Sequence, residues 1–459
     1  MTQLPAGIEQ DAEVLAGLNW LATASGDEKG YWQRIEAAQR RYHLYTDAPE
    51  NFGRDPEFSN LGPDVVASVL AQAKSLLDGR RTYDITLASR CVPWVKQIGV
   101  NASELARIPG AVERARRMLA DRVTAPDGPL LELVMGGNYA ADGLDVAFVP
   151  EAPGRAKTPD FNLLLPAVAE PVAIELKRLR QGQYEQDERA RHRQIFKWAA
   201  AIIDERRLSL HIDVIYTKEL KDVPSRYLAE RLSHFLASPV IMLGAYPWRD
   251  EFGSGEIRPA NLDAVIEDTR DSSLYVGTKM ARLLSGCEVR DNGYHLAASG
   301  VPDNRDPRFM DEVHYASVVT WQCSAAEAIE KKSRHVKNKL VEAERQVRAA
   351  DVGIIHLAMD AEVGCESSDL RRRRNKQVIL EFQSASLVAA LYVHYLVPRI
   401  SEVHSWLVDE TIDKFGASRN PVPSMMIFPG SEAVDNDLPA WKQSVPIQRH
   451  EASPGRRKR

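Results

Sequence analysis

Three short apolar segments, separated by turns that contain proline or glycine, lie between residues 144 and 176 and restrict the fold more than any other feature. Segments of this length and punctuation are typical of consecutive β-strands. A helical pattern at 130–141 precedes them, and a charged helix at about 185–204 and a strand-like run at 208–216 follow. The order helix, three strands, helix, strand predicts an α/β fold.

The third segment, 172–176, and the lysine that follows it place charged residues on one face of the expected strand. Alternation places Ala173, Glu175 and Lys177 on one face, while the aliphatic residues between them take the other. Asp160, where the preceding strand begins, alternates with apolar residues in the same way. If the two strands pair as a hairpin-like unit, Asp160 can meet Glu175.

Two converging carboxylates form a hard oxygen site that suits Mg²⁺ or Mn²⁺. Such a metal would polarise a scissile phosphate and acidify a bound water, while Lys177 would orient or deprotonate that water and offset developing negative charge. The alternative without chemistry is a surface ion pair between Glu175 and Lys177 on an edge strand, with Asp160 capping a turn. The first interpretation predicts phosphodiester hydrolysis.

The Pro-Asp pair ending at Asp160 and the Glu-Leu-Lys string from Glu175 to Lys177 resemble the PD-(D/E)XK nuclease superfamily, over about residues 111–217. The resemblance implies a restriction-endonuclease-like core. It also implies that Asp160 and Glu175 bind the metal and that Lys177 serves catalysis.

Two further roles come from the same resemblance. An acidic residue on the first core helix often completes the metal shell, and Glu132 lies at the expected place. Its alternative is an ordinary surface glutamate at a helix start, where the helix dipole favours it. Some branches use a glutamine on the second core helix, and Gln194 suits that role; otherwise it is a solvated helix residue.

Basic residues around this centre predict contacts with nucleic-acid phosphates. Arg178 and Arg180 follow the strand directly, and Arg189, Arg193 and Lys197 repeat at a helical spacing of four. Such a stripe can hold a phosphate backbone without reading its sequence, or it can be a solvated helix face.

The formal net charge of −5 gives no global attraction to nucleic acid, so this partner must be argued from local patches. Other basic runs lie at 331–339, at 371–376 and in the last residues of the chain. Each can equally be a solvated helix face or a loose tail.

A length of 459 residues predicts two or three domains. We expect a helical N-terminal region at 1–110, a PD-(D/E)XK nuclease-like core at 111–220, a mixed α/β region at 221–434 and a flexible basic tail at 435–459.

Other elements follow from local patterns. Helices are predicted at 31–45, 65–77, 111–122 and 324–349, strands at 240–246 and 352–359, a hairpin turn at 291–293, and a buried helix at 382–397. The four cysteines are scattered without a CxxC pair, which favours reduced core thiols over a disulfide framework or a zinc site.

The sequence lacks the motifs of nucleotide-triphosphate motors, dinucleotide enzymes, zincins and α/β-hydrolases. It predicts a cytoplasmic, Mg²⁺- or Mn²⁺-dependent nuclease that cuts DNA in preference to RNA, with no membrane association. A homodimer would let such an enzyme reach both strands of a duplex. The alternatives are a catalytically idle module that binds nucleic acid or protein, and an unrelated α/β protein in which the motif is coincidental.

Overall fold

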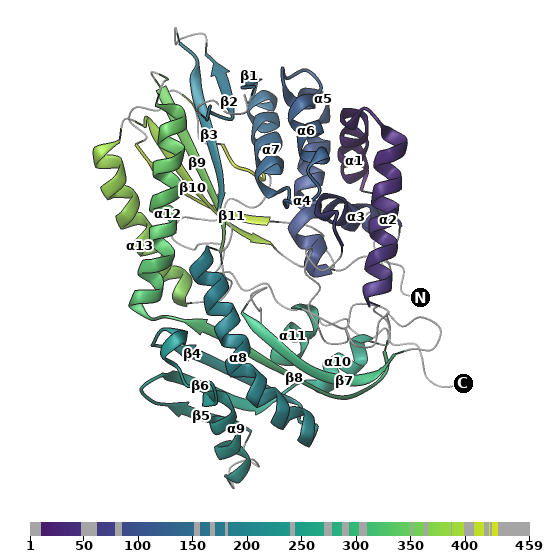
Figure 1. The fold of residues 1–459 in the computed structure, drawn as a ribbon, viewed down its shortest axis with the longest axis vertical. Helices are drawn as coiled ribbons and strands as arrows, with labels where there is room; N and C mark the ends of the chain where they lie inside the picture. The colour runs from purple at the N-terminus through teal and green to yellow at the C-terminus, as the bar shows by residue number, and fades with distance from the viewer. Residues whose placement is uncertain are drawn as a thin grey trace, which may run out of the picture.

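The computed structural model describes residues 11–46, 62–78, 85–150, 157–165, 170–179, 182–238, 244–269, 278–286, 293–302, 310–348, 350, 352–361, 366–386, 388–398, 408–416, 422 and 425–429. Within them the chain is an α/β protein with two mixed sheets, of six and five strands, and a helical N-terminal region (Figure 1). None of the helices in these ranges combines the length and the apolar character needed to cross a lipid bilayer.

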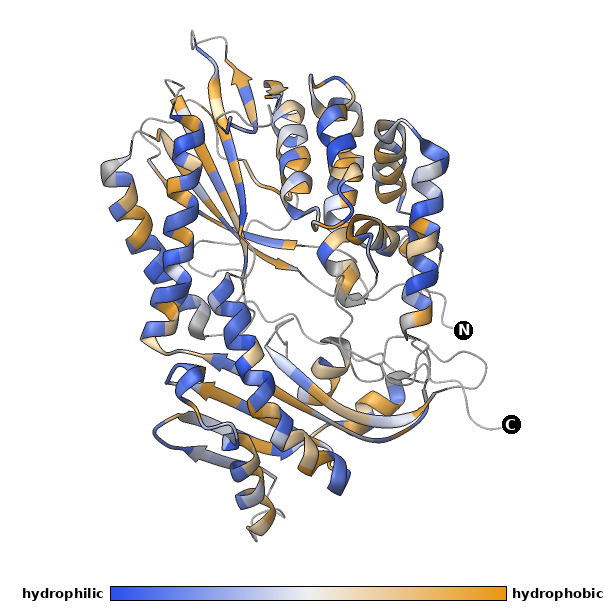
Figure 2. Ribbon diagram, viewed as in Figure 1, coloured by the Kyte–Doolittle hydropathy of each residue, from blue (hydrophilic) through white to orange (hydrophobic). Residues whose placement is uncertain are grey.

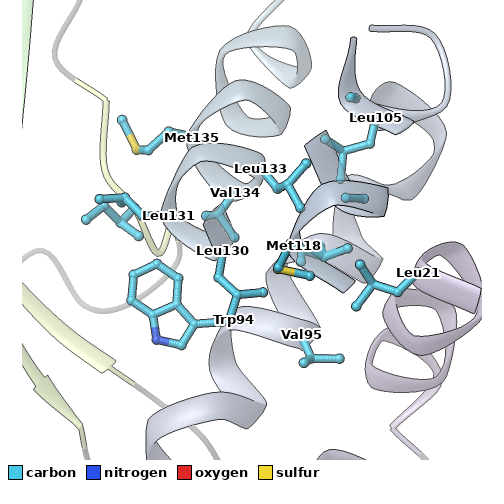
Figure 3. Packing of buried hydrophobic residues seen from close by; sticks show 14 of the residues in the cluster. Leu21, Trp94, Val95, Leu105, Met118, Leu130, Leu131, Leu133, Val134 and Met135 are labelled. Carbon is cyan, nitrogen blue, oxygen red and sulfur yellow. The ribbon is translucent and has the colours of Figure 1, made fainter. Parts of the chain in front are cut away.

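The described chain begins with helices that pack into one continuous core. They are α1 Ala12–Ser25, α2 Glu28–Thr46, α3 Val65–Asp78, α4 Ile85–Val100, α5 Ala102–Leu105, α6 Ala111–Ala120 and α7 Asp127–Ala141. The predicted N-terminal helices are confirmed as parts of α2, α3 and α6. The backbones of α1 and α4 touch, because a Cβ on Gly17 would lie 2.1 Å from the carbonyl oxygen of Val95. Figure 3 shows the packing of this core between α1, α4, α6 and α7.

The first sheet has the strand order β1-β2-β3-β9-β10-β11. The strands are β1 Asp145–Phe148, β2 Phe161–Leu164, β3 Val172–Leu179, β9 Val352–Asp360, β10 Ala390–Pro398 and β11 Val408–Phe415. Strands β1 to β3 form an antiparallel meander, β3, β9 and β10 run parallel, and β11 is antiparallel to β10. The three strands predicted between residues 144 and 176 and the strand predicted at 352–359 are therefore confirmed.

Helices cover both faces of this sheet. The N-terminal helices pack on one face, and α12 (Ala326–Val347) and α13 (Glu366–Ala385) pack on the other. The long helix predicted at 324–349 is confirmed as α12. Figure 2 shows that α12 and α13 mix hydrophilic and hydrophobic residues, as expected for helices with one buried side.

The stretch 382–397 is not the buried helix predicted from the sequence. Its first residues end α13, and β10 follows as an interior strand between β9 and β11. An interior strand is covered on both faces and carries a continuous apolar run, which periodicity alone cannot distinguish from a buried helix. The aromatic and β-branched residues Tyr392, Val393 and Tyr395 suit the strand.

The second sheet is inserted between β3 and α12, with the strand order β5-β6-β4-β8-β7. Its unit consists of α8 Gln183–Arg206, β4 Leu210–Tyr216, η3 Leu220–Asp222, α9 Tyr227–Ala237, β5 Tyr246–Arg249, β6 Gly253–Pro259, α10 Leu262–Thr269, α11 Thr278–Ser285, β7 Tyr294–Pro302 and β8 Met310–Cys323. Two buried clusters cover its faces, one with α8 and α9 and the other with α10 and α11.

The helix and strand predicted at 185–204 and 208–216 exist as α8 and β4, but they do not complete the first sheet. Strand β4 pairs with β6 and β8. The strand beside β3 is β9, which the chain reaches only after the insertion and α12. The predicted order of elements is present along the chain, but its second helix and its last strand belong to the unit of the second sheet.

Ion pairs join the inserted unit to α12 and α13. Lys332 binds Glu188 of α8 at 2.8 Å, with both side chains buried, and Arg371 binds Glu185 of the same helix at 2.8 Å. Further pairs of these helices are Lys331–Glu219, Arg372–Asp413 and Arg374–Glu330. Much of the positive charge in the runs 331–339 and 371–376 is thus bound to carboxylates of the same chain.

Several sequence predictions concern residues outside the described ranges. They are residues 240–243 of a predicted strand, the turn residues Asp291 and Asn292, Arg180, Cys287, Cys365 and the tail at 435–459. The two described cysteines, Cys91 and Cys323, are buried free thiols.

His211 of β4 is a buried histidine that the fold holds in its neutral form. Its Nδ1 accepts the Nε–H of Arg258 at 3.1 Å, and its Nε2 lies 2.8 Å from the hydroxyl of Thr320. Burial and then the charge of Arg258 lower the pKa of His211 to about 4. The unfolded chain should have a pKa of about 6.5 at this residue.

This difference predicts a loss of stability in acid. Because the folded pKa is the lower one, the contribution of His211 is complete above pH about 6.5 and is lost as the pH falls towards 4. Across that window the residue should lower the free energy of unfolding by up to about 1.4 kcal/mol per pH unit. Urea unfolding at several pH values should give a flatter pH dependence for His211→Gln than for wild type; equal slopes would contradict the prediction.

Candidate active site

The Asp160 carboxylate is fixed against the strand that carries Glu175 and Lys177. The main-chain N–H of Asp160 donates to the carbonyl oxygen of Ile174 at 3.0 Å. In return, the Asp160 Oδ2 atom accepts the main-chain N–H of Leu176 at 2.8 Å. The antiparallel pairing of β2 with β3 therefore brings the two predicted carboxylates together, and both are buried.

Strand β3 has the two faces that its alternation predicts. Ile174 and its aliphatic neighbours pack in the core of the N-terminal helices, whereas Ala173 and Leu179 pack in the core under α12 and α13. Glu175 and Lys177 share the second face, next to α12. An interior strand with covered faces is not the exposed edge that the alternative without chemistry assumed.

Lys177 is held by two side chains. Its Nζ forms an ion pair with Glu175 and donates to the Oε1 atom of Gln346 at 2.8 Å. The Nε2 of Gln346 donates in turn to the carbonyl oxygen of Thr158 at 3.0 Å. Gln346, on α12, thus links the lysine to the segment that leads into Asp160.

The sequence interpretation did not include Gln346, because it placed the glutamine of this group on the helix predicted at 185–204. The sequence did contain one signal: the long helix predicted at 324–349 comes directly before the strand predicted at 352–359. A helix in this position is typical of the crossover that leads into a parallel strand. That signal does not reveal which distant strand β9 joins.

Glu175 is the carboxylate with the most unusual environment. Burial raises its pKa, the nearby Asp160 raises it further, and Lys177 counteracts both, with the result that the pKa is raised to about 9. Its side chain is fully buried, and its Oε2 atom has no hydrogen-bond partner among the described residues. A buried carboxylate oxygen without a donor is a position where a cation or a proton would be stabilised.

Glu132 lies near this group, bound to an arginine. The Arg114 guanidinium, from α6, contacts the Glu132 carboxylate at 2.8 Å and lies 4.0 Å from the Asp160 Oδ1 atom. It also donates to the carbonyl oxygen of Asp160 at 3.0 Å. The proposed metal role of Glu132 would require its carboxylate to be shared with Arg114.

A divalent cation fits this group with two protein carboxylates. The described residues contain no cluster of three or more His, Cys, Asp or Glu side chains that could hold a metal ion. Mg²⁺ is commonly bound through one or two carboxylates and completes its shell with water and substrate phosphate. The unpartnered oxygen of Glu175 and the adjacent Asp160 carboxylate satisfy this pattern.

The structure does not bring Gln194 to this group. Gln194 is exposed on α8, where its side chain accepts a hydrogen bond from Arg191 at 3.0 Å. Arg178 points to the opposite face of β3, where it pairs with Asp360 at 2.5 Å and lies over the ring of Trp94. Both residues are therefore engaged away from Lys177.

The predicted phosphate-binding stripe lies on the inserted unit. Arg193 and Lys197 are exposed on α8, and Arg189 is partly buried on the same helix. Arg189 and Arg193 are close enough to His295 of β7 to help lower its pKa, for which burial is the largest cause. These residues accompany the second sheet and not the β2–β3 pair.

Comparison of the chain with known protein families and with curated proteins finds no match.

Proposed function

We propose that this protein is a metal-dependent phosphodiesterase that cuts nucleic acid, with Asp160, Glu175 and Lys177 as its centre. The observation that carries the proposal is the bonding of the Asp160 carboxylate to the backbone of the strand that projects the other two residues. Two buried carboxylates and an amine are thereby concentrated where β2 pairs with β3. An inert structural role gives no physical reason to bury them together.

The topology supports a restriction-endonuclease-like core, assembled from different segments than the sequence suggested. The order helix, three strands, helix, strand is formed by α7, the β1–β3 meander, α12 and β9. All four strands belong to the first sheet. In this proposal the inserted unit with the second sheet is an addition between the third strand and the second helix. Gln346 then takes the position that the resemblance gives to a glutamine on the second core helix.

The side chains divide the work by their chemistry. Asp160 and Glu175 would hold Mg²⁺ or Mn²⁺, which supplies polarisation of the scissile phosphate and a more acidic water. Lys177, positioned by Glu175 and Gln346, would orient the attacking water and offset negative charge on the phosphate. Arg114 holds the main chain of Asp160 in place. We propose DNA in preference to RNA, because most enzymes that the centre resembles act on DNA.

The test is a cleavage assay with wild type and an Asp160→Asn variant. Linear, circular and single-stranded DNA and RNA are incubated with each protein in Mg²⁺, Mn²⁺ or EDTA. We expect the wild type to cut in a metal-dependent manner and the variant to lose cutting while retaining its thermal unfolding temperature within a few degrees. Nucleic-acid binding without cleavage would contradict the enzyme and favour the idle binding module.

A further inference from the structure

One carboxylate next to the proposed centre is shared by two lysines. Glu342 lies on α12 one turn before Gln346, and its Oε1 atom accepts from Lys157 while its Oε2 atom accepts from Lys339, each at 2.9 Å. The pKa of Glu342 is lowered to about 2, chiefly by these two lysines, and Lys177 also contributes. Two ammonium groups thus bind a single carboxylate, and a third is close enough to lower its pKa.

We propose that Lys157 and Lys339 form the binding site for a substrate phosphate adjacent to the scissile one, and that Glu342 occupies this site until nucleic acid displaces it. This inference rests on the proposed function and adds the path of the substrate backbone to it. It assigns part of the affinity that does not depend on base sequence to Lys157, which the sequence prediction did not include, and to Lys339, the last residue of the basic run at 331–339.

The geometry of α12 places these groups along the edge that faces the centre. Lys339, Glu342 and Gln346 are spaced by three and four residues and therefore lie on one side of the helix. The rise from Glu342 to Gln346 is about 6 Å. Gln346 binds Lys177. A nucleic-acid strand whose scissile phosphate lies at Lys177 could therefore run along α12 and place a neighbouring phosphate at the two lysines.

The ion pairs are weak enough to be exchanged. The side chain of Lys157 is 71% exposed, and those of Lys339 and Glu342 are 36% and 34% exposed. Exposed pairs of this kind contribute only about 0–1 kcal/mol, so their opening costs little. A phosphate offers the same kind of charged oxygen acceptors as a carboxylate, and each lysine ammonium can bind either.

The other basic groups considered for phosphate binding are placed differently. Arg178 is bound to Asp360, and the pairs of Lys332 and Arg371 join the inserted unit to α12 and α13. The α8 stripe lies on the inserted unit. Lys157 is exposed and Lys339 is partly exposed, and they share a carboxylate one helical turn from the residue that binds Lys177.

The proposal predicts opposite effects for the lysines and the glutamate. Loss of either lysine removes one phosphate contact, whereas loss of the Glu342 charge removes the anion that competes with phosphate for the two lysines. If the cluster were purely structural, all three variants would either bind DNA more weakly or bind it as wild type does. The sign of the Glu342→Gln effect therefore distinguishes the two roles.

The experiment measures binding separately from cleavage. Full-length wild type, Lys157→Ala, Lys339→Ala and Glu342→Gln are titrated into a fluorescent short DNA in EDTA, between about 50 and 200 mM NaCl. Each lysine variant should bind about 3- to 10-fold more weakly and lower the salt slope by about one. Glu342→Gln should bind about 3- to 10-fold more tightly. Lys337→Ala is the matched control, because Lys337 is exposed on the far side of α12 and should leave binding unchanged.

The outcomes separate this inference from the proposed function. If wild type cleaves DNA but the lysine variants bind as wild type does, the inference is overturned and the nuclease stands. If Glu342→Gln weakens binding as the lysine variants do, the competitor role is overturned. If wild type neither cleaves nor binds nucleic acid, the proposed function fails and this site fails with it. Matched thermal melts of all five proteins exclude loss of folding as the cause.

Discussion

Replacing Lys177 by methionine should lower the rate of DNA cleavage by about 10³-fold while the protein stays folded. Methionine keeps most of the length of the side chain and removes the charge that the proposed reaction uses. Its partner Glu175 should become neutral after the exchange, because burial and Asp160 raise the pKa of Glu175 and the exchange removes the Lys177 charge that lowers it. Single-turnover cleavage under saturating metal measures the chemical step directly.

Two comparisons make this result specific. Gln346→Ala should lower the same rate only about 10-fold, because Glu175 still holds the Lys177 ammonium after its hydrogen bond to Gln346 is lost. Lys337→Met, the same exchange at an exposed position of α12, should cut at the wild-type rate. A Lys177→Met protein that cuts within a few-fold of wild type would remove the centre from the proposed mechanism.

The local part of this centre was predictable because its determinants lie close together in the chain. Asp160 and Leu176 are joined by a hydrogen bond between neighbouring antiparallel strands. The alternation of Ala173, Glu175 and Lys177 in a short strand fixes their common face without knowledge of the remaining fold. Both the meeting of the carboxylates and the amphipathic character of β3 follow from these short-range patterns.

The second core helix could not be predicted in the same way. Parallel strands such as β3 and β9 are joined by a crossover, and the sequence pattern of each strand carries no label for its partner. Here the crossover contains an entire second sheet, and its first helix and strand, α8 and β4, have the periodicity that a core helix and strand would have. The prediction therefore assigned Gln194 the role that our proposal gives to Gln346.

The same limit explains the error at 382–397. The apolar run fits a buried helix by length, and its polar residues do not settle the question. His394, within β10, is fully buried. It belongs to a chain of hydrogen-bonded side chains across the sheet, which forms only in the tertiary structure. That chain carries the second large effect that we expect.

Glu410→Ala should lower the free energy of unfolding by about 3–5 kcal/mol. Tyr139 bonds His356 at 2.8 Å, His356 bonds His394 at 2.9 Å, and His394 bonds Glu410 at 2.5 Å, all of them buried. One assignment satisfies every atom: Glu410 is ionised, each neutral histidine donates from Nδ1 and accepts at Nε2, and the Tyr139 hydroxyl donates. Removal of the terminal carboxylate leaves the whole chain without its acceptor.

The same carboxylate also fixes a distant segment, which is why the loss should be large. Glu410 accepts the main-chain N–H groups of Ile427 and Phe428 at 2.9 and 3.0 Å, and Asn138 donates to the carbonyl oxygen of Ile427 at 2.9 Å. Burying donors without an acceptor costs about 1–3 kcal/mol each. Glu410→Gln keeps one acceptor oxygen and should cost about half as much as the alanine exchange.

Urea unfolding of Glu410→Ala, Glu410→Gln and the exposed control Glu36→Ala measures these differences, and the control should stay within about 0.5 kcal/mol of wild type. Equal stability of Glu410→Ala and the control would mean that water replaces the carboxylate at no cost. The ordering alanine, then glutamine, then control is expected because it follows the number of buried donors left without an acceptor. Since this chain lies on the face of the sheet opposite Lys177, DNA cleavage by folded Glu410→Gln should remain near the wild-type rate.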